Sequence, residues 1–404
     1  MRAAGRSLRD RSSCWEIERA RGAASVMHVW PLLHLGLAAG SFALALLVVA
    51  PTPTVPLFKL SVLATEFGHW LALGPLLLLA VGPWSGLPGI AAALLALAAV
   101  GLLLSSAVRA QRLARRLPAE LAAAFGPGAA DERPFAWRRL WFAPALRAVK
   151  VEVREFAEHG GEKLALHFYR SQHAGPAPCV IVIHGGGWEG GSPDEFVACN
   201  HRLAAHGCAV AAVQYRFAPR SPWPAQREDV LAALRFLQSR ADEFGLAPEK
   251  FVLLGRSAGG QIAKAVAYSA HDPAIRGCIA FYAPADMRFA HEFARDDDII
   301  SSLGLVLRYM GGAPLDLPAN YDSASGIRLA TRTSPPTLLL HGRRDPYVWY
   351  LQSQRLAARL RAVGAPHYFL DLPWATHGFD FNPNGPGGQL AAYAIERFLA
   401  AVTR

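Results

Sequence analysis

A buried strand that ends in a tight turn is predicted by the stretch Phe251-Val252-Leu253-Leu254-Gly255-Arg256-Ser257-Ala258-Gly259-Gly260. The apolar run stops at Gly255, and an alanine-rich helical pattern resumes after Gly260. The intervening Gly-x-Ser-x-Gly spacing is typical of a strand-to-helix turn that exposes a nucleophilic serine, with glycines where side chains would collide with backbone. The helix that follows would direct its amino end toward a developing anion. Ser257 is therefore the candidate nucleophile. The alternative is an ordinary glycine-rich turn that happens to contain a serine. The other motifs of the chain decide between a nucleophile and this alternative.

A base and an acid are predicted in the loops after two later strands. The stretch His341-Gly-Arg-Arg-Asp345 closes one apolar strand, and His377 follows the last strand within a few residues. Loops at the carboxyl ends of parallel strands meet at one edge of a sheet. We therefore expect His377 to be the base and Asp345 the acid that orients it. Three rival acids are less favoured: Asp286 follows the sixth strand and suits an anchor for the lid, Asp371 lies within the last strand, and Asp380 is beside the base in the sequence. His184 is the rival base, and its place before the glycines favours a structural role.

Donors for an oxyanion are expected from two stretches of backbone. Three glycines follow His184, and without Cβ atoms their N–H groups can approach a substrate oxygen. The N–H of Ala258, directly after the candidate nucleophile, is the natural partner donor.

Strands and helices alternate from Val149 onward, which predicts a mostly parallel sheet covered by helices on both faces. Two strand-like stretches flank His159-Gly-Gly161 and predict a β-hairpin at the start of the domain. The capping-box pattern Ser192-Pro-Asp-Glu195 predicts a helix that continues to about His206. Residues 286–335 are too long for an ordinary connection and suit a lid. The acidic run 296–298 is interpreted as a solvated face, and no metal site is expected.

These motifs together resemble the hormone-sensitive-lipase-like esterases of the α/β-hydrolase superfamily, over residues of about 165–402. The resemblance implies an α/β-hydrolase fold and carboxylester hydrolysis without a cofactor. It assigns Ser257 as nucleophile, His377 as base, Asp345 as orienting acid, and Gly186 and Gly187 to the oxyanion hole. The matching stretches are His184-Gly-Gly-Gly-Trp188, Tyr215-Arg-Phe-Ala-Pro219, Pro222-Trp-Pro-Ala225 with Asp229, Gly255-Arg-Ser-Ala-Gly-Gly260, His341-Gly-Arg-Arg-Asp345 and His377-Gly378. Arg256, Gln214 and Arg220 stand where acidic residues are usual in this family, so the surroundings of the site differ.

The composition separates the two ends of the chain. Of 404 residues, 52% are hydrophobic, and the formal net charge is +10. Residues 1–150 carry a balance of +9 and residues 151–404 a balance of +1. No zinc-finger, P-loop or RNA-binding motif accompanies the basic region, which suits anionic lipid headgroups better than nucleic acid. Five scattered cysteines without a CxxC pair indicate buried thiols in a reducing compartment: Cys14, Cys179, Cys199, Cys208 and Cys278.

Three transmembrane helices are expected in the first part of the chain, with two as the alternative. The apolar stretches are Val29–Ala50, Leu60–Gly82 and Gly86–Val108. Glu66 and His69 share one helical face in the second stretch. They are interpreted either as a functional pair inside the membrane or, more simply, as side chains that reach water near its surface.

The expected organisation follows from these features. Residues 1–27 are a disordered basic terminus, 28–108 the transmembrane region, 109–148 a basic and aromatic linker, and 149–404 the catalytic domain. The aromatic stretch 135–142 is interpreted either as an interfacial segment or as one that packs on the next domain. A start at Met27 would leave an uncharged N-terminus and place Arg109–Arg116, with the catalytic domain, in the cytoplasm.

The expected function is a membrane-anchored serine esterase that acts on hydrophobic or lipid-like esters. Its expected partners are this substrate and membrane lipids, without nucleic acid or cofactor. The alternatives are an acyltransferase that uses the same acyl-serine, and an amidase, formamidase or peptidase of the same fold.

Overall fold

The structure, a computed structural model, describes residues 30–127, 133–144 and 148–404. The expected disordered terminus 1–27, including Cys14 and Met27, lies outside the described residues. The chain divides into two compact units. Of the described residues, the apolar unit comprises 30–50 and Phe67–Ser105, and the sheet unit comprises Pro51–Glu66 with 106–127, 133–144 and 148–404.

The sheet unit is built on eight strands in the order β1-β2-β4-β3-β5-β6-β7-β8. The β1–β2 and β2–β4 pairs are antiparallel and all later pairs are parallel, as the alternation of strands and helices predicts. The strands are β1 (Val151–His159), β2 (Glu162–Tyr169), β3 (Ala177–Ile183), β4 (Ala209–Val213), β5 (Leu246–Arg256), β6 (Ile275–Phe281), β7 (Thr337–Gly342) and β8 (His367–Leu372). The expected hairpin is formed by β1 and β2.

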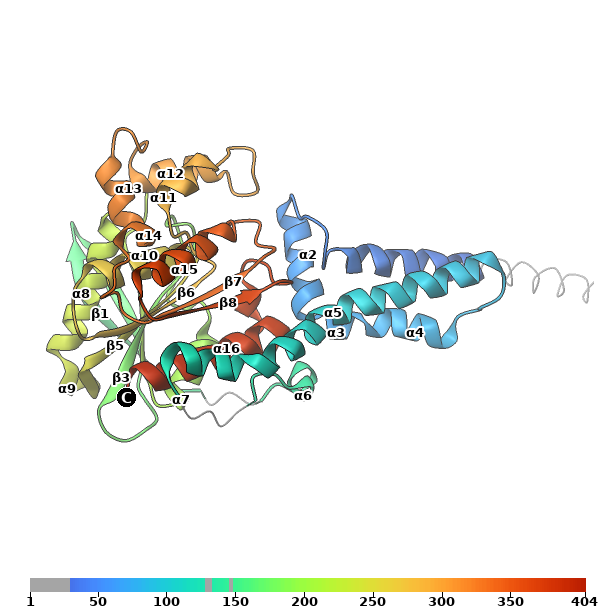
Figure 1. Cartoon of the computed structure of the whole chain (residues 1–404), viewed down its shortest axis with the longest axis horizontal. Coiled ribbons are helices and arrows are strands. Elements are labelled where there is room, and N and C mark those ends of the chain that lie inside the picture. Colours follow the sequence, from blue (N-terminus) through green and yellow to red (C-terminus); the bar gives the residue numbers. More distant parts are fainter. Residues whose placement is uncertain (1–29, 128–132, 145–147) are drawn as a thin grey trace, which may run out of the picture. The chain divides into compact units, whose positions relative to one another are not determined.

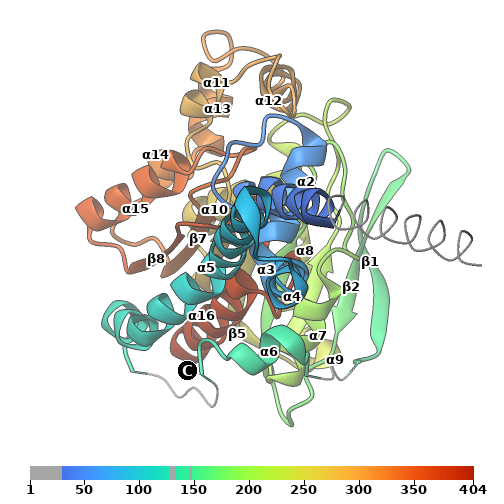
Figure 2. The ribbon, with the colours of Figure 1, turned by 90° about the vertical axis from the view of Figure 1, so that its right-hand side faces the viewer.

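Helices cover both faces of this sheet (Figures 1 and 2). Alternate residues of β3 point to opposite faces, so Ile181 and Val182 belong to different cores. One core is closed by α8 (Ala225–Ser239), α10 (Ala258–Ser269) and α15 (Leu351–Val363). The other is closed by α7 (Val197–Ala205), α16 (Pro386–Val402) and the last part of α5 (Gly86–Phe125). The short helix α9 (Ala241–Phe244) precedes β5.

The second core also includes part of the aromatic stretch 135–142. Phe135 and Leu140, the latter in α6 (Trp137–Trp141), are buried in it. The Ala136 N–H donates to Gln389 Oε1 of α16 at 2.9 Å. Phe135 and Leu140 therefore pack on the sheet unit, whereas Trp137 and Phe142 are 40% and 71% exposed, so packing accounts for only part of the stretch.

One predicted helix start is wrong. Helix α7 begins at Val197 and not at Ser192. The Ser192 hydroxyl accepts a hydrogen bond from the Asp194 N–H, two residues on, which forms a local turn in place of a helix cap. Phe196 then takes a left-handed conformation, with φ of 55°, which separates this turn from the helix.

The expected lid, residues 286–335, contains four short helices (Figure 1). They are α11 (Met287–Glu292), α12 (Ser302–Met310), α13 (Pro318–Ala324) and α14 (Gly326–Leu329). Asp286 caps α11 by accepting from the N–H groups of Arg288 and Phe289, and it pairs with Arg355 of α15. Asp286 thus anchors the segment after β6. The described residues contain no group of His, Cys, Asp and Glu that could hold a metal ion.

The expectation of three membrane spans is not supported. Only α5, with 40 residues, is long and apolar enough among the described residues, and a second span exists only if a bent pair of helices counts as one. The first stretch forms a shorter helix, Trp30–Leu46. The second is broken after Glu66, where α2 (Val55–Glu66) and the following helices α3 (Gly68–Leu71) and α4 (Leu73–Val81) meet at 86°.

The break has a local cause and two consequences. Phe67 leaves the helical conformation, with φ of −119° and ψ of 16°. Glu66 and His69 therefore lie in different helices, so the argument from a shared helical face fails. Helix α5 in turn continues through Arg109–Arg116, which were expected in a linker, because arginine, leucine and alanine all favour helices.

The glycines of the turn after β5 give a prediction for stability. A Cβ at Gly255 would overlap the carbonyl of Gly259, so we expect Gly255→Ala to lose about 2 kcal/mol or more. The thermal midpoint of the detergent-solubilised chain should fall by roughly 4–8 °C. Gly190→Ala is the control, because a Cβ there meets nothing within 4 Å. Equal midpoints for the two variants would contradict the close approach at Gly255.

Candidate active site

Ser257 lies at the carboxyl end of β5, the central strand of the parallel part of the sheet. Its φ of 52° and ψ of −119° are unusual for a residue with a Cβ, and its N–H donates to Phe281 O at 3.0 Å. It immediately precedes α10, and a Cβ at Gly259 would overlap the carbonyl groups of Ile183 and His184. Gly255 and Gly259, which lack a Cβ, therefore allow β3, β5 and α10 to approach closely enough to hold Ser257 in this turn.

Asp345 and His377 meet across the loops that follow β7 and β8. Asp345 Oδ2 lies 2.6 Å from His377 Nδ1. The other carboxylate oxygen accepts from the N–H groups of Tyr347 and Val348, at 2.8 and 2.9 Å. Burial alone would raise the pKa of Asp345, but the positive charge available on His377 and the hydrogen bonds from His341 and His377 outweigh it, and the pKa lies below its usual range. Asp345 is therefore a buried carboxylate that stays ionised.

His341 supports Asp345, a role that its place in the motif His341-Gly-Arg-Arg-Asp345 did not reveal. The ring is fully buried, with Nε2 3.1 Å from Asp345 Oδ2 and 3.0 Å from Val348 O. Nδ1 lies 2.7 Å from the Ser353 hydroxyl. An Nε2–H tautomer satisfies all these partners, because Nε2 donates and Nδ1 accepts. The spacing of four residues between His341 and Asp345 is the one feature of the sequence that could have indicated this contact.

A cavity of about 780 Å³ contains all six residues predicted for the site. Ser257, Asp345 and His377 line it together with Gly186, Gly187 and Ala258. No hydrogen bond joins the Ser257 hydroxyl to the His377 ring, and such contacts often tighten only when substrate is bound. The lid and the loop after β7 supply apolar walls, among them Phe289, Phe293, Leu305, Val306 and Trp349.

The glycine loop after β3 presents its backbone to this cavity. Gly186 and Gly187 have φ of 102° and 60°, a region that favours glycine. The described residues offer no hydrogen-bond acceptor to the amides of Gly186, Gly187 and Ala258. These three N–H groups are thus available to an oxygen atom of a bound molecule.

His184 is unsuited to act as the base. Its ring stacks on Tyr215, with centroids 4.3 Å apart, and Nδ1 lies 2.8 Å from Gly185 O. Burial lowers the pKa of His184 to about 4, although the hydrogen bond to Gly185 opposes the shift. A buried ring that stays neutral and does not line the cavity fits a structural role.

The three rival acids are engaged elsewhere. Asp371 forms an exposed pair with Arg343. Asp286 caps α11. Asp380 accepts from Arg256 Nε at 2.6 Å and from the Tyr282 hydroxyl at 2.7 Å. None of them is bonded to His377 in the described part of the chain.

Arg256 and Tyr282 support the site in a way that the sequence did not reveal. The ion pair between Arg256 and Asp380 is almost completely buried and joins the end of β5 to the turn after His377. The Tyr282 ring lies against the His377 ring, with centroids 4.3 Å apart. Arg256 was recognised only as a departure from an acidic residue, and its partner lies 124 positions away in the sequence.

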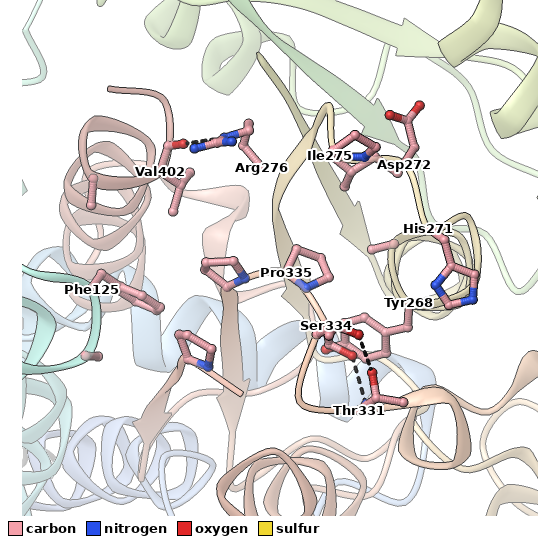
Figure 3. Close-up of a pocket in the computed structure, with 17 residues that line it drawn as sticks. Phe125, Tyr268, His271, Asp272, Ile275, Arg276, Thr331, Ser334, Pro335 and Val402 are labelled. Atoms are coloured by element: carbon pink, nitrogen blue, oxygen red, sulfur yellow. Dashed lines mark hydrogen bonds between the residues drawn. The ribbon is translucent and has the colours of Figure 1, made fainter. Parts of the chain in front are cut away.

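A second cavity, of about 700 Å³, lies at the opposite edge of the sheet, where β6, β7 and β8 begin (Figure 3). Several of its polar groups are paired within the protein. Thr331 N–H donates to the Ser334 hydroxyl, and Arg276 Nε donates to Val402 O. Asp272 Oδ1 accepts from the Ala274 N–H. Because no nucleophile is paired with a base there, this cavity does not compete with the first as a reaction site.

Comparisons with known proteins agree with this architecture. The family model described as BD-FAE matches residues 166–360. The probable carboxylic ester hydrolase LipM of Mycobacterium tuberculosis is 28% identical over 72% of this chain and 74% of its own length. An acetyl-hydrolase of Streptomyces hygroscopicus is 30% identical over 55% of this chain and 76% of its own length. For two further M. tuberculosis proteins, the esterases LipC and LipQ, the match covers only 59% and 60% of their own lengths.

The solved structures show the same fold. A bacterial heroin esterase superposes with a TM-score of 0.55 at 24% identity, covering 65% of this chain and 87% of its own. Taken with the glycine loop, the serine turn and the order of the later acidic and histidine loops, these similarities show that the chain belongs to the hormone-sensitive-lipase-like esterases of the α/β-hydrolase superfamily.

Proposed function

We propose that this protein is a membrane-anchored serine esterase in which Ser257, His377 and Asp345 form the catalytic triad. The observation that carries the proposal is the 2.6 Å hydrogen bond between Asp345 Oδ2 and His377 Nδ1, within the cavity that Ser257 also lines. With Nδ1 donating to Asp345, the other ring nitrogen is free to accept a proton.

The reaction follows from this arrangement. His377 Nε2 removes the Ser257 proton as Oγ attacks the ester carbonyl, and the amides of Gly186, Gly187 and Ala258 bind the resulting oxyanion. His377 then gives the proton to the leaving alcohol oxygen, and Ser257 keeps the acyl group. Water attacks the acyl-serine by the same route in reverse, which releases a carboxylic acid and restores the serine. Asp345 stays ionised throughout and stabilises the imidazolium.

The cavity supports an ester with a sizeable apolar group as substrate. Aromatic and aliphatic side chains dominate its walls, and its volume of about 780 Å³ lies within the usual range of ligand pockets. Burying apolar groups of the substrate against such walls is favourable by about 25 cal/mol per Å².

Helix α5 supports the anchoring part of the proposal. It is the one unbroken helix of the described residues with the length and hydropathy of a membrane span. Four arginines follow its apolar part, within Arg109–Arg116, so the positive-inside rule places this end of the helix in the cytoplasm. The four described cysteines are free, which suits a reducing compartment.

The acid of the triad is tested by a matched pair of substitutions in the full-length chain, with a panel of p-nitrophenyl esters. Asp345→Asn should lower kcat by about 10³–10⁴-fold, because the His377 ring loses the partner that sets its tautomer. Asp371→Asn removes a similar charge from the exposed pair with Arg343 and should change kcat less than about twofold. Ser257→Ala gives the background rate.

The same assay separates the alternatives. A wild-type chain no faster than Ser257→Ala on every ester would contradict the proposed function, and equal losses at Asp345 and Asp371 would contradict the acid. Formation of a new ester in place of the free acid, when an alcohol is added, would identify an acyltransferase.

The position of the catalytic unit is tested by reporters fused after Arg404. We expect a reporter that is active only in the cytoplasm to be active, and one that is active only after export to be silent. The opposite pattern, with protease access to the unit in intact cells, would place the unit outside.

A further inference from the structure

Glu66 belongs to the same compact unit as the catalytic site. It is the last residue of α2, and α2 is part of the sheet unit although its neighbours in the sequence on both sides belong to the apolar unit. The Glu66 side chain is fully buried, and Oε2 accepts a hydrogen bond from the Gly387 N–H at 3.0 Å. The side-chain amide of Asn382 donates to the Glu66 carbonyl oxygen at 3.1 Å. A helix end from the N-terminal part of the chain is thus bound to the segment just after the catalytic histidine.

The residues that receive Glu66 are shaped for it. We call residues 382–388, which begin shortly after His377 and end in the first turn of α16, the receiving turn. A Cβ at Gly385 would overlap Glu66 Oε2, and a Cβ at Gly387 would lie only 3.1 Å from Glu66 Oε1. The glycines at these positions therefore leave the space that the Glu66 carboxyl group fills.

The first turn of α2 reaches a residue that contacts the catalytic histidine. The Phe58 ring lies against the Tyr347 ring, with centroids 4.6 Å apart. The Tyr347 ring in turn contacts the His377 ring, with centroids 5.1 Å apart, and the Tyr347 N–H donates to Asp345. Phe58 is therefore one side chain away from both His377 and its orienting acid.

The receiving turn is also close to His377. Asp380 lies between the two in the sequence and is fixed by its bonds to Arg256 and Tyr282. Tyr282 covers the face of His377 at a centroid distance of 4.3 Å. Helix α2 is thus linked to the segment around His377 twice: Phe58 contacts Tyr347, and Glu66 is bonded to the receiving turn.

From these contacts we propose that α2 is a positioning element for His377, with Glu66 and Phe58 as its positioning residues. The proposal rests on the proposed function, because it takes His377 as the catalytic base. Helix α2 lies outside residues 166–360, which match the family model, as do β8, His377 and α16. In this chain the N-terminal segment does more than anchor the enzyme: it completes the support of the catalytic base.

The test compares Glu66→Ala and Phe58→Ala with the wild type in the full-length, detergent-solubilised protein. Each should lower kcat by about tenfold while KM changes less than about threefold, because a small displacement of His377 affects the reaction more than substrate binding. Glu66→Gln should retain kcat within about threefold. Burial raises the pKa of the Glu66 carboxyl to about 8, so the neutral amide is a close replacement at neutral pH and still accepts from Gly387.

Two controls separate positioning from a loss of folded protein. Leu60→Ala and Leu63→Ala change α2 side chains that are 40% and 44% exposed, and both should behave as the wild type. Rates are expressed per active site, counted by labelling with a fluorophosphonate carried to completion. Glu66→Ala with a full kcat per labelled site would overturn the proposal.

Hydrogen–deuterium exchange gives a readout that does not require activity. In Glu66→Ala, the peptide that spans residues 377–388 should exchange faster than in the wild type, and in Glu66→Gln it should not. Unchanged exchange in Glu66→Ala would also overturn the proposal. If the wild type turned over no ester, the proposed function would fail, while this measurement would still show whether α2 holds the segment after His377.

Discussion

The hydrogen bond between Asp345 Oδ2 and His377 Nδ1 joins the loops after two adjacent strands, and much of the structure is needed to make it possible. A fully buried carboxylate is costly unless its oxygens are bonded. Here two backbone amides, His341 and His377 supply those bonds. His341 is held in turn by Ser353 of α15, so the packing of that helix on the sheet fixes the tautomer that supports the acid. The catalytic geometry thus depends on strand pairing and helix packing together.

A second buried charge pair links the end of β5 to the turn after His377. Arg256 directly precedes Ser257, and Asp380 lies three residues after His377, so their ion pair joins the segments that carry the proposed nucleophile and the proposed base. The guanidinium also lies over the rings of Phe196 and Phe281, at 4.1 and 4.7 Å. A buried ion pair adds little net stability against apolar packing, but it fixes the position of both partners. The reversed charge at position 256, compared with the usual acidic residue of the family, is therefore matched by Asp380.

The sequence predicted the catalytic half well, because its motifs have local meanings. A glycine turn after a buried strand, three glycines after another and polar loops after two more follow from strand periodicity together with motif spacing and the resemblance to a known family. The N-terminal half was predicted less well, since apolar residues signal burial without telling whether lipid or protein covers them. Phe58 and Leu140 face protein, and the break after Glu66 leaves residues 60–66 of an expected span in the sheet unit and residues 67–82 in the apolar unit. Glu66 and Gly387 are 321 positions apart, so nothing in the sequence near either residue indicates that they are hydrogen-bonded.

The central claim, that Ser257 carries the acyl group between the two half-reactions, can be observed directly. Full-length protein is mixed with a p-nitrophenyl ester, quenched in acid within the first turnover, digested, and examined by peptide mass spectrometry. We predict that the acyl group is found on the peptide that contains Ser257, that it forms with the burst of p-nitrophenol, and that Ser257→Ala shows neither. An acyl group on a different residue, or steady ester turnover by Ser257→Ala, would contradict the account.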